Sequence, residues 1–103
     1  MSRQPESVIL SAVREHLRQQ GYLTIRHQAC LGSHPGLSDL TAVRDGVTLY
    51  VECRTPRGRL SAAQERFQRD VEAHGARYIV ACSVEDVAAL TGGCLALAVG
   101  EGA

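Results

Sequence analysis

The sequence predicts an α/β fold in which a mixed sheet is flanked by helices. Helical and strand periodicities alternate along the 103 residues in the order α-β-β-β-α-β-α. Asp45-Gly46 separates two runs of strand-forming residues and is typical of a two-residue hairpin, because both central positions of a type I′ turn need positive φ. A strand-helix-strand unit follows this hairpin, so the sheet should contain both antiparallel and parallel neighbours.

The first half of the chain should hold one helix and three strands. Pro5 suits the first turn of a helix and Gly21 its end, which places a helix at about 5–20. Its apolar stripe should consist of Val8, Ile9, Ala12, Val13 and Leu17. The expected strands are about 22–31, 38–44 and 47–54, with a turn at 32–36 before the second of them.

The second half should add a strand between two helices. Ser61 with Gln64 three residues later is the signature of a capping box, which begins a helix that reaches about residue 74. Ser83 with Asp86 favours the start of another helix in the same way. The remaining expected elements are a strand at 77–82 and a helix at about 84–91, while 94–99 fits either a strand or a helical turn.

The composition is that of one ordinary globular domain, residues 1–103, with 45% hydrophobic and 21% charged residues and no net charge. No apolar run approaches the roughly 18 residues that span a bilayer, and the first residues lack the apolar segment of a signal peptide. We therefore expect a cytoplasmic protein without a membrane association. Five arginines and one glutamate between 54 and 69 form either a phosphate-contacting stripe or a solvated helix face.

Neither the cysteines nor the histidines predict a zinc site. The four cysteines contain no CxxC pair, and we expect them to act as small buried apolar residues. His16, His27 and His74 show no spacing typical of metal ligands.

The candidate chemistry centres on two acids, Asp39 and Glu52. Alternation along strand 47–54 puts Glu52 and Arg54 on one face and an apolar set on the other. The hairpin register places Asp39 opposite Glu52, with Cβ atoms about 4.5–5.5 Å apart. Carboxylates this close repel each other unless a cation lies between them, and oxygen ligands suit magnesium or manganese. The alternative is a pair of solvent-facing acids on an edge strand, with Arg54 as a salt-bridge partner.

These residues resemble the motifs of a known nuclease family. Gly36-Leu-Ser-Asp39, a hairpin, and the segment from Val51 to Gln64 (VECRTPRGRLSAAQ) are similar to the VRR-NUC family of PD-(D/E)XK nucleases. That family has G-x-x-D, then E-x-K, a short glycine-containing loop, Leu-Ser and a helix with a glutamine. The resemblance runs from Glu6 to the turn at 83–86, and it implies a restriction-endonuclease-like α-β-β-β-α-β core.

The resemblance also implies an activity. The expected protein is a nuclease that depends on Mg²⁺ or Mn²⁺ and hydrolyses phosphodiester bonds in DNA, as a homodimeric endonuclease specific for branched or junction DNA. Asp39 and Glu52 would bind the metal together with the backbone carbonyl of Cys53, and Glu6 would join through a water. Gln64 would orient water or a phosphate beside them.

Four further residues are candidates for nucleic-acid binding. His34 and Ser38 lie in the segment that leads to Asp39, and Arg57 and Arg59 follow the acidic strand in a loop. Arginine side chains commonly contact backbone phosphates, but solvent exposure without a partner is an equal alternative for the two loop arginines. For His34, exposure without a function is the more common situation.

Arg54 departs from the family pattern, which has lysine at this position. Arginine cannot be deprotonated in practice, so a general-base role is lost, whereas its charge can still stabilise a phosphate. All eleven basic residues of the chain are arginine, so the replacement follows a bias of the whole sequence. Three functions stay open: an active nuclease, a weakened or inactive nucleic-acid-binding module of the same fold, and an α/β interaction domain with Asp39 and Glu52 as ordinary surface acids.

Overall fold

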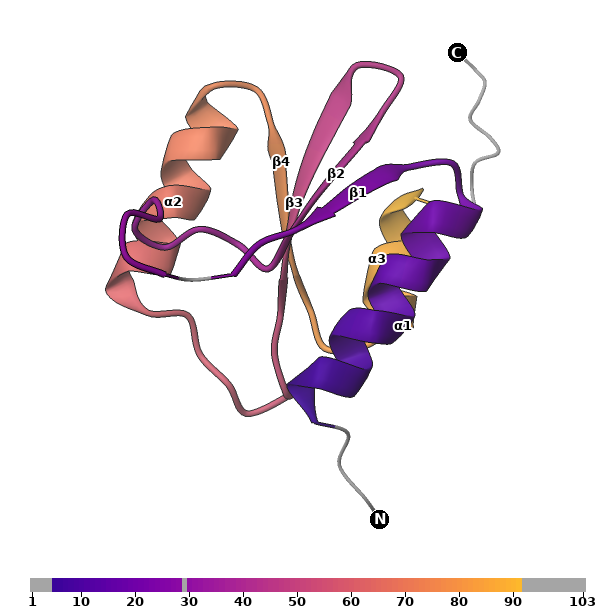
Figure 1. Ribbon diagram of the computed structural model, residues 1–103, viewed down its shortest axis with the longest axis horizontal. Coiled ribbons are helices and arrows are strands. Elements are labelled where there is room, and N and C mark those ends of the chain that lie inside the picture. The colour runs from indigo at the N-terminus through magenta and orange to yellow at the C-terminus, as the bar shows by residue number, and fades with distance from the viewer. Residues whose placement is uncertain (1–4, 29, 92–103) are drawn as a thin grey trace.

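The computed structural model describes residues 5–28 and 30–91, and these residues form helices and strands in the predicted order (Figure 1). Each element is within a few residues of its expected place, with one exception in the first strand. The elements are α1 (Glu6–Gln19), β1 (Leu23–Arg26), β2 (Leu40–Arg44), β3 (Val47–Cys53), α2 (Ala62–Ala73), β4 (Arg77–Ala81) and α3 (Val84–Thr91).

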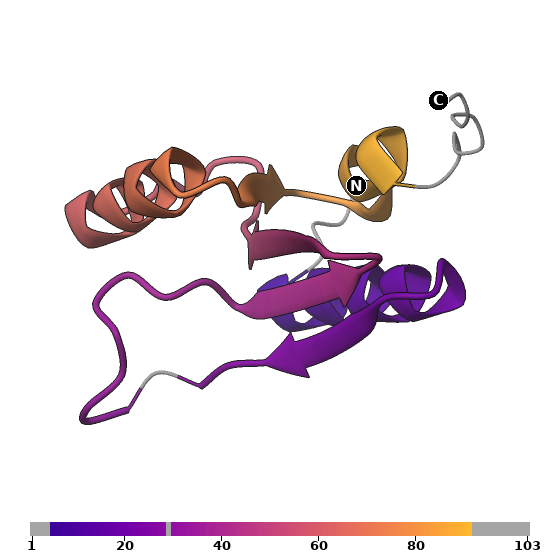
Figure 2. The same ribbon diagram turned by 90° about the horizontal axis from the view of Figure 1, so that it is seen from above.

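The strands form one mixed sheet in the order β1-β2-β3-β4 (Figure 2). β2 runs antiparallel to both β1 and β3, whereas β3 and β4 are parallel. α2 makes the crossover between the parallel strands, because such neighbours cannot be joined by a short turn. The predicted α/β fold with a mixed sheet is confirmed, and β3 lies inside the sheet with a partner on each side.

The hairpin between β2 and β3 has the predicted turn and register. Asp45 and Gly46 have φ angles of 52° and 81°, the positive pair that a type I′ turn requires. Thr41 lies opposite Tyr50, as expected from the turn. Opposite residues point to the same face, so Glu52, two residues beyond Tyr50, also points away from the core.

The hydrophobic core fills the space between one face of the sheet and the helices α1 and α3, which lie together on that side (Figure 1). β3 contributes Leu49, Val51 and Cys53, none more than 2% exposed. On α1 the predicted apolar stripe is partly wrong, because the buried face is centred on Val13 and Leu17 and includes Leu10. Val8 and Ala12 lie on the flank of that face and are exposed.

α2 lies on the opposite side of the sheet, where an aromatic cluster attaches it (Figure 1). Phe67 of α2 is 6% exposed, and the centroid of its ring lies 5.1 Å from that of Tyr50 and 6.2 Å from that of Tyr78, both in edge-to-face arrangements. The sequence places these aromatics far apart, but the parallel pairing of β3 with β4 brings the two tyrosines side by side. This contact positions the first turn of α2 next to the end of β3.

The first strand is shorter than predicted. β1 ends at Arg26, and its last backbone contact to the neighbouring segment is the His27 N–H, which donates to the Asp39 carbonyl at 2.8 Å. Beyond this point the chain leaves the sheet on the side of α2 (Figure 2), so Cys30 is exposed rather than buried in a strand. Cys53 is buried as expected and Cys82 is half-buried.

The element expected at 94–99, together with Cys94, lies outside the described residues. Within residues 5–28 and 30–91, no helix has the length and apolar character needed to cross a membrane.

Candidate active site

A pocket of about 300 Å³ opens where the ends of β2 and β3 meet the start of α2. It brings together six of the side chains that the sequence predicted for the site, from three separate segments of the chain. These are His34, Ser38, Asp39, Glu52, Arg54 and Gln64. The other lining residues are His27, Ser33, Gly36, Leu37 and Ser61.

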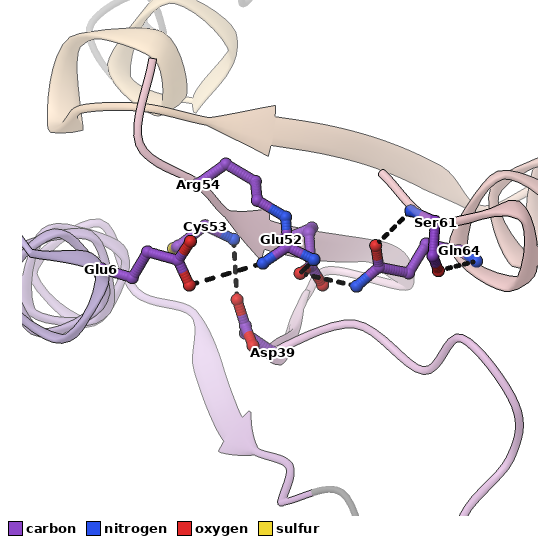
Figure 3. Close-up of polar contacts among 7 residues, drawn as sticks. All are labelled: Glu6, Asp39, Glu52, Cys53, Arg54, Ser61 and Gln64. Atoms are coloured by element: carbon purple, nitrogen blue, oxygen red, sulfur yellow. Dashed lines mark hydrogen bonds and ion pairs between the residues drawn. The ribbon is translucent and has the colours of Figure 1, made fainter. Parts of the chain in front are cut away.

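Asp39 lies just outside the hairpin ladder, which ends at the pair Leu40–Val51. The expected direct pairing with Glu52 is therefore replaced by a side-chain contact, in which the Cys53 N–H donates to Asp39 Oδ2 at 2.8 Å. This bond uses one carboxylate oxygen and holds the Asp39 side chain at the pocket rim beside Glu52 (Figure 3).

Glu52 is the buried acid of the site. Only 2% of it is exposed, which contradicts the alternative of a solvent-facing acid on an edge strand. Its Oε2 accepts from Arg54 Nη2 at 2.9 Å and from Gln64 Nε2 at 3.0 Å. Its Oε1 is buried and has no hydrogen-bond partner among the described residues. A buried carboxylate oxygen without a partner is costly unless a ligand satisfies it.

Burial raises the pKa of Glu52 from 4.5 to about 7, and the nearby negative charge of Asp39 adds to the increase. The Arg54 guanidinium acts in the opposite direction but does not compensate fully. Around neutral pH, the ionised form of Glu52 is therefore poorly stabilised by the protein alone. A cation placed between the two acids would stabilise it.

This raised pKa predicts a pH-dependent stability for the metal-free protein. The folded state favours the protonated form of Glu52. The contribution of this carboxyl group to the free energy of unfolding is therefore fully present below pH 4.5 and is lost as the pH rises through about 7. The free energy of unfolding in EDTA should fall by up to about 3 kcal/mol between pH 5 and pH 8, at about 1.4 kcal/mol per pKa unit.

Urea denaturation of wild type and Glu52→Gln at both pH values measures this effect. Glutamine keeps the size and the polar contacts but does not titrate, so subtraction removes the contribution of the histidines. An equal fall in both proteins would show that Glu52 is not the cause.

Arg54 lies between two acids rather than beside one (Figure 3). Its Nη2 contacts Glu52 and its Nη1 contacts Glu6 Oε1 at 3.4 Å, which connects the end of β3 to the first turn of α1. Its Nε is buried without a partner in the described part of the chain. The guanidinium is thus the built-in counter-charge of the acidic pocket, a position that follows from the alternation along β3.

Gln64 combines two roles that its motif predicted separately. The predicted capping box is present, since the Ser61 hydroxyl accepts from the Gln64 N–H and Gln64 Oε1 accepts from the Ser61 N–H at 2.8 Å. Because the amide oxygen is used for the cap, the amide nitrogen must point the other way, where it donates to Glu52. The cap therefore orients the glutamine toward the acid.

Comparison with solved structures identifies the fold that holds this pocket. A structure described as a "VRR_NUC domain" is similar to this chain with a TM-score of 0.69 and 22% sequence identity, over 82% of this chain and 91% of that chain. This chain has the VRR_NUC fold. No protein-family model and no curated protein matches the sequence. The restriction-endonuclease-like core expected from the motifs is confirmed as a fold.

The resemblance implies a divalent metal ion, which the acids of this VRR_NUC fold would have to bind. Within residues 5–28 and 30–91, no three His, Cys, Asp or Glu side chains cluster closely enough to form a metal site by themselves. Mg²⁺, however, commonly binds through one or two carboxylates and keeps several waters. Asp39 and the unpartnered Oε1 of Glu52 fit that requirement. Arg54 lies between Glu6 and Glu52, and the contact of Glu6 with the metal through a water stays a prediction.

Cys53 could contribute its backbone but not its thiol. Its side chain is completely buried in the core, and burial raises the pKa of the thiol to about 12, so the sulfur stays protonated. The carbonyl, which the family resemblance assigns to the metal, belongs to the same residue whose N–H holds Asp39. That assignment stays a prediction.

The residues predicted to contact nucleic acid occupy different environments in the VRR_NUC fold. His34 is exposed on the pocket rim and meets the Phe67 ring at 5.4 Å. Arg57 and Arg59 are exposed in the loop after β3 and do not line the pocket. Ser38 is 2% exposed and its hydroxyl donates to the Leu40 carbonyl at 2.9 Å, so it stabilises the turn before β2. A direct contact between Ser38 and nucleic acid stays a prediction without support from this geometry.

Nothing in the sequence indicated that His27 belongs to the pocket. His27 lines the pocket, with Nε2 2.6 Å from Thr41 Oγ1, and it lies there because β1 pairs with β2. The pairing of β1 with β2 determines the position of His27, and this pairing is difficult to predict because a long loop connects the two strands. Gly36 was recognised as part of a motif, but its structural role is a close contact with the backbone of Ala63 on α2.

Proposed function

We propose that this domain is a divalent metal-dependent nuclease that hydrolyses phosphodiester bonds in DNA. The observation that carries the proposal is the convergence of Asp39 and the buried Glu52, with its unpartnered Oε1, in one pocket with Arg54 and Gln64. Two carboxylates, a guanidinium held in place and an oriented side-chain amide form an arrangement that is suited to bind a phosphodiester and a water molecule. The VRR_NUC fold of the chain supports the same conclusion.

Asp39 and Glu52 would hold the metal ion in this mechanism. When bound, Mg²⁺ or Mn²⁺ polarises the phosphodiester and makes water a stronger nucleophile at neutral pH. Asp39 is held for this purpose by the Cys53 N–H, and Glu52 by Gln64. The two contacts fix both carboxylates before substrate arrives, which lowers the cost of ordering them.

Arg54 would stabilise the negative charge that develops on the phosphate. A guanidinium can form two parallel hydrogen bonds with a phosphate, and it stays charged throughout the reaction. It cannot take the proton of the attacking water, so that proton has to pass to solvent or to the substrate. Binding of an anionic phosphate between Glu52 and Arg54 requires the guanidinium to exchange one of its acidic partners for the substrate.

A weakened or inactive nucleic-acid-binding module is the second candidate function. The contact of 2.9 Å between Arg54 and Glu52 favours it, because the guanidinium already supplies a positive charge beside the carboxylate, which lowers the need of the pocket for a metal ion. Both candidates share the same fold and pocket. Cleavage therefore distinguishes them, whereas a further structure of the free protein does not.

The test is cleavage of labelled linear, flapped and four-way-junction DNAs and of single-stranded RNA, in Mg²⁺, Mn²⁺ or EDTA. Asp39→Asn protein, purified in parallel, controls for contaminating nucleases. We expect metal-dependent products from wild type alone, with branched DNA preferred. Binding without cleavage under every condition would favour the second candidate, and absence of both binding and cleavage would favour an interaction domain.

Variants of Arg54 test its electrostatic role. Arg54→Gln removes the charge and should lower the cleavage rate by about a hundred- to thousandfold, the usual loss when one fixed group that stabilises developing charge is removed. Arg54→Lys is the matched control, because it keeps the charge, and it should stay within about tenfold of wild type. Single-turnover rates at saturating protein measure both. A large gain in Arg54→Lys would instead show that arginine weakens this site.

The proposal also includes a homodimer. β1 is an edge strand whose Leu23 and Ile25 are 65% and 44% exposed, and a small domain gains buried apolar area by covering such residues. Sedimentation at several protein concentrations measures the association. A monomer at every concentration would exclude the dimer without affecting the proposed chemistry.

A further inference from the structure

A second hollow lies beside the candidate active site, between α2 and the loop that precedes β2. Its volume is about 650 Å³, roughly twice that of the acidic pocket. His34 and Pro35 line it on the loop side, and α2 contributes Ala62, Ala63, Arg66, Phe67, Arg69 and Asp70. The family motifs assign no role to these residues of α2, although Arg66 and Arg69 belong to the basic stripe at 54–69, whose alternatives were a phosphate contact and a solvated helix face.

The loop side of the hollow is held against α2 by two contacts. Gly36 approaches the backbone of Ala63 so closely that no side chain fits between them. His34 meets the ring of Phe67 at 5.4 Å, and Phe67 itself is packed into the aromatic cluster on the sheet. The hollow is therefore defined by packed backbone and ring contacts rather than by the positions of two exposed side chains.

Its chemistry combines an apolar lining with positive charge. Phe67, Ala62 and Ala63 contribute apolar groups to its lining, and Arg66 and Arg69, one helical turn apart on α2, contribute two positive charges. Neither arginine forms an ion pair with an acid in the described part of the chain. Asp70 is the acidic group of the lining, and its charge leaves the two arginines in excess.

The hollow adjoins the acidic pocket. His34 lines both, and Ala62 and Ala63 follow directly after Ser61, which lines the pocket. A polymer whose scissile bond lies at Asp39 and Glu52 would have to leave the pocket past one of its walls. A nucleic-acid strand has the matching chemistry, because each nucleotide carries one negative phosphate and one flat base with apolar faces.

We propose that this hollow is a substrate subsite, in which Arg66 and Arg69 bind a backbone phosphate of the nucleic-acid strand and the apolar lining contacts the adjoining nucleotide. The inference rests on the proposed function, because it takes the substrate from it. The subsite would bind the nucleic-acid strand at a second position, outside the acidic pocket in which the strand is cleaved. Phosphate contacts position a strand without reading its sequence, so the subsite should act on every sequence alike.

The test measures binding rather than cleavage. All proteins carry Asp39→Asn and are assayed in EDTA by fluorescence anisotropy, with a labelled duplex that has a single-stranded tail. Arg66→Gln/Arg69→Gln should bind about tenfold more weakly, and the slope of log affinity against log salt should fall by about one for each phosphate that the protein no longer neutralises. Two tails of unrelated sequence should lose the same factor.

The matched control is Arg18→Gln/Arg26→Gln, which removes the same charge from exposed positions on β1 and on α1, the helix on the opposite side of the sheet from α2 (Figure 1). It should bind almost as wild type. Equal losses in both double variants would mean that net charge alone is measured, and would overturn the subsite. Unchanged binding in Arg66→Gln/Arg69→Gln would overturn it too, as would a change in oligomeric state without a change in affinity, which would assign the hollow to a second copy of the chain.

Circular dichroism of the double variants verifies that α2 is intact. The results can contradict the proposed subsite and the proposed nuclease activity independently. Specific loss of binding in a protein whose wild type never cleaves DNA would keep the subsite and remove the enzyme. Cleavage by a wild type whose binding does not depend on Arg66 and Arg69 would do the reverse.

Discussion

Asp39→Asn should abolish metal-dependent cleavage, with a loss of about a thousandfold or more. The substitution changes one oxygen to an amide nitrogen and removes a negative charge from the pocket. The asparagine carbonyl can still accept from the Cys53 N–H, so the local backbone should be kept. What is lost is one of the two carboxylates available to a divalent cation, and with it the polarisation of the phosphodiester.

The control for this prediction lies in the same hairpin. Asp45→Asn makes the same chemical change at an exposed turn position with positive φ, which asparagine tolerates well. Its cleavage rate should equal that of wild type. Melting temperatures of both variants should stay near the wild-type value. Full cleavage by Asp39→Asn would remove Asp39 from the mechanism, and a cooperative loss of structure would make it a residue of the fold instead.

Gly36→Ala should destabilise the protein by about 2–4 kcal/mol, the largest effect on stability that we expect from a single methyl group in this chain. Gly36 has a φ of 76°, which L-residues rarely adopt. A Cβ atom there would overlap the Ala63 carbonyl and come within 2.9 Å of the Gln64 N–H. Backbone atoms cannot rotate away, so the loop has to separate from the first turn of α2.

Urea denaturation of Gly36→Ala beside Gly32→Ala separates the two causes. Gly32 lies in the same loop with a φ of 93°, but a Cβ atom there would meet no other described atom within 4 Å. Gly32→Ala should therefore cost only the backbone strain, about 1 kcal/mol. Equal losses in the two variants would show that the contact with Ala63 contributes nothing. Because that contact also holds the wall beside Gln64, cleavage should decrease in Gly36→Ala alone.

Local chemistry was sufficient to predict much of this fold. The positive φ angles of Asp45 and Gly46 follow from the turn they form, and the turn determines the register of β2 with β3. Alternation along β3 then puts Glu52 and Arg54 on one face. The capping box of Ser61 and Gln64 begins α2 where expected. Each of these features depends on residues a few positions apart, so the sequence contains all the information required.

Other features depend on contacts between distant segments, and only the tertiary structure decides them. The placement of His27 depends on the pairing of β1 with β2 across a loop whose length does not determine a register. The burial of Glu52 depends on α2, which covers the end of β3 through Gln64. The sequence does not show whether another element covers the face of the sheet on which a carboxylate lies.

The same distinction separates the two arginine sites. Arg54 could be placed beside Glu52 from strand alternation, but its second contact, to Glu6, spans almost half the chain. The basic stripe at 54–69 could be read from the sequence, but the hollow that Arg66 and Arg69 line exists only because Gly36 packs on α2. Periodicity and turn chemistry determined which residues share a face. Packing between segments decided that Glu52 is buried, that Arg54 lies between two acids, and that a hollow forms beside α2.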